Sequence, residues 1–252
     1  MKDSVRKKYP TVAEVTDIER IEMVKEIFAT VTGSYDLLNH ILSLGQDIAW
    51  RRFAVKKMCF FDTCRMLDVA TGTADLGITV ARCHPDTHIT GLDFVREMVN
   101  VAHEKVRARH LSDRIRLMVG DALFLPFPDS SFDVVAMAFG LRNIPDKVCA
   151  LREMCRVVVP GGQVMVLELT LPRIRIFQRP YAVYLNRILP RLATAFSSNP
   201  GAYHYLGDSI MNFQTPEILA GLMKKAGLER VRKYPLTLGV AHLHVGVKPA
   251  VF

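Results

Sequence analysis

Short apolar segments alternate with helical segments between Met66 and Leu169, and this alternation constrains the fold more than any other feature of the chain. The expected strands cover residues 66–70, 88–92, 115–119, 132–138 and 164–169. The expected helices between them cover residues 76–83, 97–108 and 147–157. Strands and helices that alternate in this way form βαβ units, whose parallel strands are covered by helices on both faces. With closing strands at 229–234 and 240–247, the sequence predicts an α/β fold with a seven-stranded, mostly parallel sheet and an antiparallel last strand.

The segments outside this alternation are mainly helical. Apolar residues recur at helical spacing in the opening residues, and breaks are expected between residues 31 and 43. A second helical segment covers residues 177–196, where Pro180 and Pro190 are expected to limit the helical pieces. Thr215 as an N-cap and Gly227 beyond the last turn predict a further helix over 216–226.

Acidic side chains follow three successive strands of the predicted sheet. Asp68 lies near the end of the first strand, which leads through Gly72 into a helix, and such a turn lets backbone N–H groups approach a ligand. Asp93 ends the second strand about twenty residues after Gly72, where an acid can accept both hydroxyl groups of a ribose. Asp121 and Ala122 follow the third strand and could bind the amino group and a ring nitrogen of an adenine. Because ligands of open α/β sheets bind at the carboxyl ends of the strands, these residues predict one nucleoside site.

The residues of the turn distinguish two kinds of nucleoside ligand. A dinucleotide fingerprint requires glycine at three positions, which Ala70, Gly72 and Asp75 occupy here. An acid at the third position would repel a pyrophosphate but attract the ammonium group of a methionyl tail. The turn therefore favours S-adenosylmethionine over NAD as the cofactor. Taken singly, each acid also has a structural explanation, Asp75 beside a helix N-terminus, Asp121 in a turn and Asp93 as a helix cap.

Composition excludes several other classes of protein. The net charge of +8 attracts anionic partners, but no basic stripe or RNA-binding module accompanies it, so we expect no nucleic-acid partner. Five cysteines without a C-x-x-C pair predict neither a disulfide framework nor a zinc site, and we expect no metal. Residues 1–10 lack the apolar core of a signal peptide, and the longest apolar run, 134–141, is too short to cross a bilayer. We therefore expect a cytoplasmic protein.

Several strings resemble those of class I methyltransferases, which have a Rossmann-like fold and use S-adenosylmethionine. These strings are Asp68 to Asp75, Leu125 to Asp129 with Phe132-Asp133, and Arg156 to Gly162. Four further strings resemble, more narrowly, the ubiquinone/menaquinone biosynthesis C-methyltransferase family. They are Tyr35 to Asn39, Trp50 to Phe53, Phe139 to Asn143 and Tyr205 to Ile210. The resemblance runs from about residue 24 to residue 247, and the string at 139–143 is its most specific part.

The resemblance implies carbon methylation of demethylmenaquinol, or of a related polyprenyl hydroquinone, in quinone biosynthesis. The residues expected to bind the cofactor are Asp68, Gly72, Thr73, Asp75, Asp93, Asp121 and Ala122. Two positions depart from the family pattern, because Ala74 replaces the usual glycine and Ala138 replaces the serine of many relatives. We expect the methyl group of Ala74 near the methionyl group, with altered cofactor affinity but retained activity.

The chemistry implied by the resemblance assigns roles to several side chains. The enzyme must align the ring carbon, methyl group and sulfur, exclude water and promote loss of a phenolic proton. Arg142 and Asn143 follow the fourth strand and are the expected catalytic residues. A guanidinium is a poor base but can stabilise a phenolate, and an amide can orient the same oxygen. Tyr35, Tyr205 and His244 are expected to bind substrate; His244 could also act as the base, or could serve only the packing of its strand.

The isoprenoid tail of such a substrate implies apolar surroundings and a nearby membrane. Residues 1–60 are expected to form a helical lid over the substrate, and residues 61–252 the cofactor-binding core, with a helical insertion over about 173–212. Basic residues around this insertion predict peripheral contact with anionic lipid at the inner face of the cell membrane. They are Arg173, Arg175, Arg179, Arg187 and Arg191. The chain could also form a homodimer.

Three other functions remain open at this point. The chain could methylate another small phenolic or lipid substrate, act as an NAD-linked oxidoreductase, or serve as a non-catalytic cofactor-binding scaffold for quinone enzymes. The missing glycines argue against the oxidoreductase. The retained acids argue against the scaffold.

Overall fold

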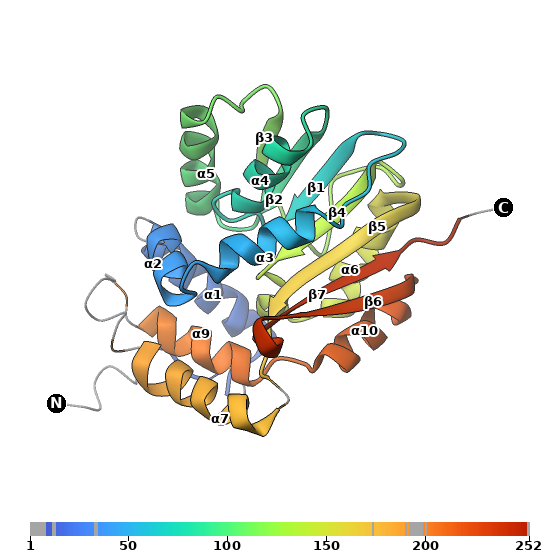
Figure 1. Cartoon of the computed structure of the whole chain (residues 1–252). Coiled ribbons are helices and arrows are strands. Elements are labelled where there is room, and N and C mark those ends of the chain that lie inside the picture. The colour runs from blue at the N-terminus through green and yellow to red at the C-terminus, as the bar shows by residue number, and fades with distance from the viewer. Residues whose placement is uncertain are drawn as a thin grey trace.

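A seven-stranded sheet forms the centre of the computed structural model, which describes residues 9–11, 14–32, 35–172, 174–189, 191, 199 and 201–250. The strands are β1 (Arg65–Val69), β2 (His88–Asp93), β3 (Ile115–Val119), β4 (Phe132–Ala138), β5 (Val158–Leu169), β6 (Glu229–Leu236) and β7 (Ala241–Val247). Their order across the sheet is β3-β2-β1-β4-β5-β7-β6 (Figure 1). Strands β1 to β5 are parallel, whereas β7 is antiparallel to both β5 and β6. The predicted fold, including its antiparallel last strand, is confirmed.

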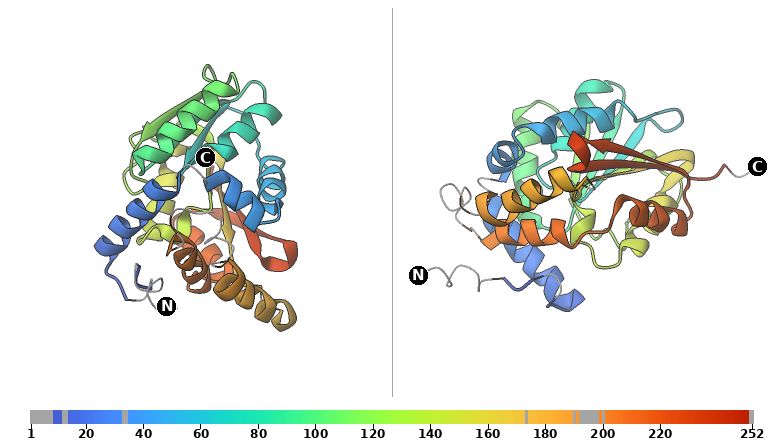
Figure 2. Two further views of the ribbon diagram at one scale, coloured as in Figure 1. Left: turned by 90° about the vertical axis from the view of Figure 1, so that its left-hand side faces the viewer. Right: turned by 60° about the horizontal axis from the view of Figure 1, so that its bottom comes forward.

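Helices cover both faces of this sheet. The α-helices are α1 (Asp17–Val31), α2 (Tyr35–Leu42), α3 (Gln46–Val55), α4 (Asp75–Cys83), α5 (Arg96–Ala108), α6 (Lys147–Val157), α7 (Arg175–Val183), α9 (Gly201–Met211) and α10 (Pro216–Lys225). Shorter elements are the 3-10 helices η2 (Leu141–Asn143) and η4 (Thr237–Gly239) and the π-helix η3 (Tyr184–Ile188). Helices α3, α4 and α5 pack on one face, and α6 and α10 on the other (Figures 1 and 2).

The alternation of side chains along each strand explains why two apolar layers form. Met66 of β1 belongs to the cluster under α3 and α4, whereas its neighbour Leu67 belongs to the cluster under α6 and α10. Successive strand residues point to opposite faces, so a strand covered on both sides must be apolar throughout. All residues of β4 except Ala138 are buried, which accounts for the unbroken apolar run that the sequence shows there.

Three boundary predictions were wrong. Pro180 lies inside α7 and does not limit a helix there. The segment continues into η3, which packs against α9 and carries the buried Leu185, and this tertiary contact outweighs the one helical hydrogen bond that proline removes. Strand β5 begins at residue 158 and not at residue 164, because it continues through Pro160, Gly161 and Gly162, where a register shift against β4 absorbs the extra residues. A regular helix, α2, occupies 35–42, where breaks were expected. Pro190 lies outside the described residues.

A third apolar cluster joins α1, α2, η3 and α9 at the edge where the parallel strands end (Figure 2). Its buried members include Ile27, Leu38, Leu185 and Tyr205. These four elements come from both ends of the chain, so the surroundings of the strand ends are assembled from segments distant in sequence. In the described part of the chain, no helix combines the length and the apolar character needed to cross a bilayer.

Candidate active site

Two adjoining cavities lie at the carboxyl ends of β1, β2 and β4. The smaller cavity, of about 150 Å³, lies between α1 and the loops that follow β2 and β3. The larger, of about 340 Å³, lies between the turn after β1 and the helices α2, α3, α7, η3 and α9. Five residues line both cavities: Tyr35, Ala70, Gly72, Ala138 and Phe139. The two cavities therefore meet along one shared wall and form one site.

Asp93 is fixed at the boundary of the smaller cavity. Its Oδ2 atom accepts the backbone N–H of Gly72 at 2.7 Å, and its Oδ1 atom accepts that of Val95 at 2.9 Å. Gly72 has a φ of +56°, and a Cβ there would meet nothing within 4 Å, so the left-handed backbone, and not crowding, favours glycine. Burial raises the pKa of Asp93, although its backbone hydrogen bonds oppose this shift. This carboxyl group faces the cavity in the position predicted for a ribose ligand.

The remaining wall of the smaller cavity fits an adenine. Asp121 and Ala122 line it from the loop after β3, and Phe94 and Met98 contribute apolar surface. The side chain of Asp121 accepts the N–H of Leu123 at 2.9 Å, which holds the loop in place. A ribose acceptor, an adenine-sized apolar slot and a polar edge thus occur together, so the residues present fit the nucleoside part of S-adenosylmethionine.

Asp68 holds the turn after β1 in place through hydrogen bonds. It is buried, and its Oδ2 atom accepts the hydroxyl group of Thr71 at 2.7 Å and the N–H of Gly77 at 3.2 Å. Burial raises the pKa of Asp68 to about 7, although both hydrogen bonds oppose the shift. Near neutral pH this carboxyl group is therefore only partly ionised, and it acts on the site mainly by holding the turn.

Asp75 lines the larger cavity but already has a cationic partner. Its Oδ1 atom lies 2.5 Å from Nζ of Lys105, which also lies 2.5 Å from Asp36 of α2. Thr73 joins this network by donating its hydroxyl group to Asp36 at 2.6 Å. The network ties α2 to the turn after β1. Contact of Asp75 with a methionyl ammonium group remains a prediction, and Lys105 now competes for the same carboxyl group.

Ala74 and Ala138, the two departures from the family pattern, lie in different places. Ala74 is fully buried in the core cluster under α3 and has a φ of +67°, so its methyl group does not line either cavity. Direct contact of this methyl group with the methionyl group is therefore not supported by the cavity lining, although the neighbours Thr73 and Asp75 do line the larger cavity. Ala138 lines both cavities, as expected for a position that contacts cofactor.

Arg142 is buried between the larger cavity and the end of β5. Its Nη1 atom donates to Oε1 of Glu168 at 2.7 Å and to the carbonyl of Phe139 at 2.5 Å, and Glu168 is wholly buried. Burial would lower the pKa of Arg142, but the charges of Glu168 and Tyr35 and the hydrogen bond to Glu168 together outweigh burial and raise it. Its Nε atom is buried without a hydrogen-bond partner among the described residues. The guanidinium is therefore a permanent cation with one unused donor.

The other predicted substrate residues lie at different depths. Tyr35 lines both cavities, and burial raises its pKa. Asn143 lines the smaller cavity, and its Oδ1 atom accepts the hydroxyl group of Tyr205 at 3.1 Å. Tyr205 is buried and lines only a minor cavity of about 40 Å³ behind Tyr35. Asn143 and Tyr205 thus form a pair that supports the wall behind Tyr35.

The structure does not bring His244 to this site. Its ring is buried within β7, where Nε2 lies 2.9 Å from the carbonyl oxygen of Pro216 at the start of α10, and it lines none of the three cavities. Burial lowers the pKa of His244 to about 4, so the ring is neutral at pH 7 and donates its Nε2 hydrogen to Pro216. His244 therefore serves the packing of its strand, which was the structural alternative to a role in substrate binding. No group of His, Cys, Asp and Glu suited to a metal occurs among the residues described.

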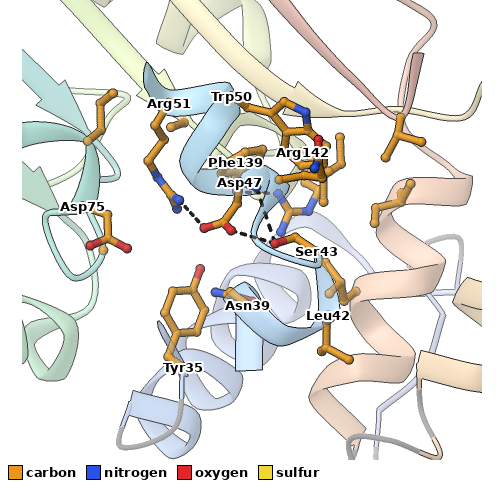
Figure 3. Close-up of a pocket in the computed structure, with 18 of the residues that line it drawn as sticks. Tyr35, Asn39, Leu42, Ser43, Asp47, Trp50, Arg51, Asp75, Phe139 and Arg142 are labelled. Carbon is orange, nitrogen blue, oxygen red and sulfur yellow. Dashed lines mark hydrogen bonds and ion pairs between the residues drawn. The ribbon is translucent and has the colours of Figure 1, made fainter. Parts of the chain in front are cut away.

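Several residues of the larger cavity were not predicted as site residues. Figure 3 shows Arg51 on α3 forming an ion pair with Asp47, which also accepts the hydroxyl group of Ser43. The hydroxyl group of Tyr35 points toward this pair (Figure 3). Phe139, with a φ of +61°, places its ring 5.2 Å from the Arg51 guanidinium. The strings at 50–53 and 139–143 contained Arg51 and Phe139, but nothing in the sequence distinguished the cavity-facing members of these strings, and Ser43 and Asp47 lie outside them.

The fold and the nucleoside pocket define an S-adenosylmethionine-dependent methyltransferase of the Rossmann-like class. The model of the ubiE/COQ5 methyltransferase family matches residues 15–248. The chain belongs to this family, which removes the NAD-linked oxidoreductase from consideration.

Relatives agree with this assignment, and solved structures share the fold. The chain is 44% identical over 227 residues to a demethylmenaquinone methyltransferase of Deinococcus radiodurans, covering 90% of this chain and 93% of the relative. It is 41% identical to a ubiquinone/menaquinone biosynthesis C-methyltransferase of Geotalea daltonii, covering 91% and 98%. Its fold matches an S-adenosylmethionine-dependent methyltransferase of Aquifex aeolicus with a TM-score of 0.56 at 18% identity, covering 78% and 88%.

Proposed function

We propose that this enzyme transfers a methyl group from S-adenosylmethionine to a ring carbon of a polyprenyl hydroquinone of the demethylmenaquinol type. The observation that carries the proposal is the junction of the two cavities, where a nucleoside pocket adjoins a larger, mainly apolar space beside the buried cation Arg142. The names of the relatives from Deinococcus radiodurans and Geotalea daltonii, a demethylmenaquinone methyltransferase and a ubiquinone/menaquinone biosynthesis C-methyltransferase, support the same choice of substrate.

Residues of the larger cavity account for recognition of the ring. When bound, S-adenosylmethionine supplies a methyl group that its positively charged sulfur has already activated. Arg142 stays protonated, so it stabilises the negative charge that develops on a phenolic oxygen and does not remove the proton. Arg142 lines the larger cavity, so its charge acts on a ring that is bound there. Tyr35 and Phe139 line the junction and exclude water from the reacting carbon.

The far end of the larger cavity suits an isoprenoid chain. Apolar side chains from α2, α7, η3 and α9 line it: Leu42, Tyr181, Tyr184, Leu185, Leu189, Leu206 and Ile210. A cavity of about 340 Å³ holds a ring and only the first part of a long polyprenyl tail. The remainder of the tail must leave through the mouth of the cavity, which we place near Leu44 because this lining residue is 86% exposed.

The direct test is turnover by the purified protein. With S-adenosylmethionine and a chemically reduced, short-tailed demethylmenaquinol, we expect mass spectrometry to detect a product heavier by one methylene group, together with S-adenosylhomocysteine. The oxidised quinone is the matched control, because it has no phenolic proton to lose and should not react. Binding of S-adenosylhomocysteine without turnover on reduced naphthoquinol or benzoquinol substrates would instead support the non-catalytic scaffold.

We further propose that the mouth of the larger cavity rests on an anionic membrane surface. Exposed apolar side chains lie on α2, α7, η3 and η4, which contribute other residues to the cavity lining, and on the loop after α2: Leu37, Ile41, Leu44, Ile176, Val183, Ile188 and Leu238. Arg179, Arg187 and Arg191 are exposed nearby, whereas Arg173 and the side chain of Arg175 lie outside the described residues. Apolar groups flanked by arginines match the interface between acyl chains and anionic headgroups. The helical lid, the core and the insertion remain the predicted division of the chain.

Co-sedimentation with anionic vesicles tests this surface. We expect binding at low salt that weakens at high salt, because each basic group contributes about 1 kcal/mol near the surface. Replacing Leu44, which is 86% exposed at the mouth, with aspartate should weaken binding of the protein to anionic vesicles about tenfold. Ile218→Asp is the control, since Ile218 is 52% exposed on α10, which lies away from α7 and α9 (Figure 1). Equal losses in both variants, or no binding of the unaltered protein, would contradict the proposal.

A further inference from the structure

Arg51 is a cation of the larger cavity to which the proposed reaction assigns no role. It lies on α3, lines the cavity, and has a side chain only 12% exposed. Its Nη1 atom lies 2.5 Å from Oδ2 of Asp47, and its guanidinium carbon lies 5.2 Å from the ring centre of Phe139. These two contacts hold the guanidinium beside Phe139, a residue of the wall shared by both cavities.

The part of the donor that reaches this position follows from the arrangement of the cavities. Asp93 and the loop after β3 fit the ribose and adenine in the smaller cavity. The two cavities meet at Ala70 and Gly72, so the amino-acid end of the donor must extend past this turn into the larger cavity. That end carries a carboxylate, which requires a cation or several N–H donors when it is removed from water.

Two cationic side chains line the larger cavity among the described residues, Arg51 and Arg142. Arg142 is paired through Nη1 with Glu168, which is wholly buried. A ligand carboxylate that replaced Glu168 in this pair would leave the charge of Glu168 buried and unpaired, which is costly. The partner of Arg51 is already shared, because Asp47 also accepts from Ser43 Oγ at 2.7 Å and lies 2.8 Å from Nδ1 of His40. The charge of Arg51 is consequently less completely neutralised than that of Arg142.

The guanidinium of Arg51 also has donors to spare. Its hydrogen bond within the described part of the chain uses Nη1, which leaves Nε and Nη2 for a planar acceptor. Two N–H groups of one guanidinium match the two oxygens of a carboxylate. The charge of Arg51 also acts on Asp68 at the end of β1, lowering its pKa against the effect of burial, which places the guanidinium near the turn that the donor must pass.

We propose that Arg51 binds the carboxylate of the methionyl group and so selects a donor that carries an intact amino-acid end. The assignment concerns the donor alone, so it stands or falls independently of the quinol substrate. Asp47 is then a positioning residue, which holds the guanidinium in place through Nη1 while the other face meets the ligand.

The test compares two ligands that differ only at this end. S-adenosylhomocysteine has the carboxylate, whereas 5′-methylthioadenosine has the same nucleoside and sulfur without the amino-acid group. Calorimetry gives the ratio of the affinity for S-adenosylhomocysteine to the affinity for 5′-methylthioadenosine. This ratio should be about ten- to a hundredfold lower in Arg51→Met than in the unaltered protein, because a charge-assisted hydrogen-bond pair is lost. Affinity for methylthioadenosine should stay unchanged, which also shows that the variant is folded.

Arg52→Met is the matched control, since Arg52 is the exposed neighbour on the same helix, and its ratio should equal that of the unaltered protein. An unchanged ratio in Arg51→Met would overturn the proposal. If Arg51→Met also lost methylthioadenosine, Arg51→Gln, a neutral side chain that keeps N–H donors, would decide by the same ratio. If the ratio in Arg51→Gln equalled that of the unaltered protein, the proposal would likewise be overturned.

Discussion

Replacing Arg142 with methionine is expected to reduce turnover about a hundred- to a thousandfold while leaving S-adenosylhomocysteine affinity within a few-fold of normal. The loss is that of one preorganised cation beside the oxygen on which charge develops. Arg142 lines the larger cavity and not the smaller one, so the nucleoside pocket stays intact. Steady-state kinetics with the reduced quinol, together with calorimetry, separates the two effects.

The same substitution has a cost in stability that a second change should remove. Without Arg142, the wholly buried Glu168 lacks its ionic partner, and breaking such a pair costs about 3–5 kcal/mol. Exchanging Glu168 for glutamine in the same chain removes the buried charge and should restore most of the thermal stability. Turnover should remain low in the double variant. Recovery of turnover together with stability would show that Arg142 serves only the fold.

The substitution Asp93→Asn should weaken binding of S-adenosylhomocysteine about a hundredfold or more. The carboxyl group accepts two backbone N–H groups, from Gly72 and Val95, and is placed to accept the ribose hydroxyls as well. An amide of the same shape turns one acceptor into a donor and removes the charge that strengthens each bond. Calorimetry with S-adenosylhomocysteine and 5′-methylthioadenosine measures the effect, and both ligands should lose affinity equally because both carry the ribose.

This equal loss distinguishes Asp93 from Arg51, whose substitution should affect only the ligand with a carboxylate. Asp113→Asn is the control, because Asp113 is exposed beyond the end of α5 and should leave both affinities unchanged. Burial raises the pKa of Asp93 in the free protein, so affinity should decline as the pH falls through that raised pKa, at a higher pH than for an exposed aspartate. Normal affinity in Asp93→Asn would remove this residue from the nucleoside pocket.

The fold could be predicted almost completely from the sequence, because strand and helix periodicity, together with the handedness of βαβ units, leaves few arrangements. Strands β3 and β4 and helix α6 were predicted to the residue. The nucleoside pocket was predictable for a similar reason, since the carboxyl ends of parallel strands converge and bring Asp93 and Asp121 to one cavity. Both results depend on local pattern and sheet topology, which the order of residues determines.

The larger cavity depended on contacts that the order of residues does not reveal. Its walls come from α2, α3, α7 and α9, which pack by side-chain fit and without a repeating rule. Tertiary packing alone paired Asp75 with Lys105 and placed Arg51 beside Phe139. It also buried His244 on the far side of the sheet, against the start of α10. Sequence therefore determined which strand ends carry the residues predicted to bind the nucleoside, whereas tertiary structure decided which cations and aromatic rings line the larger cavity.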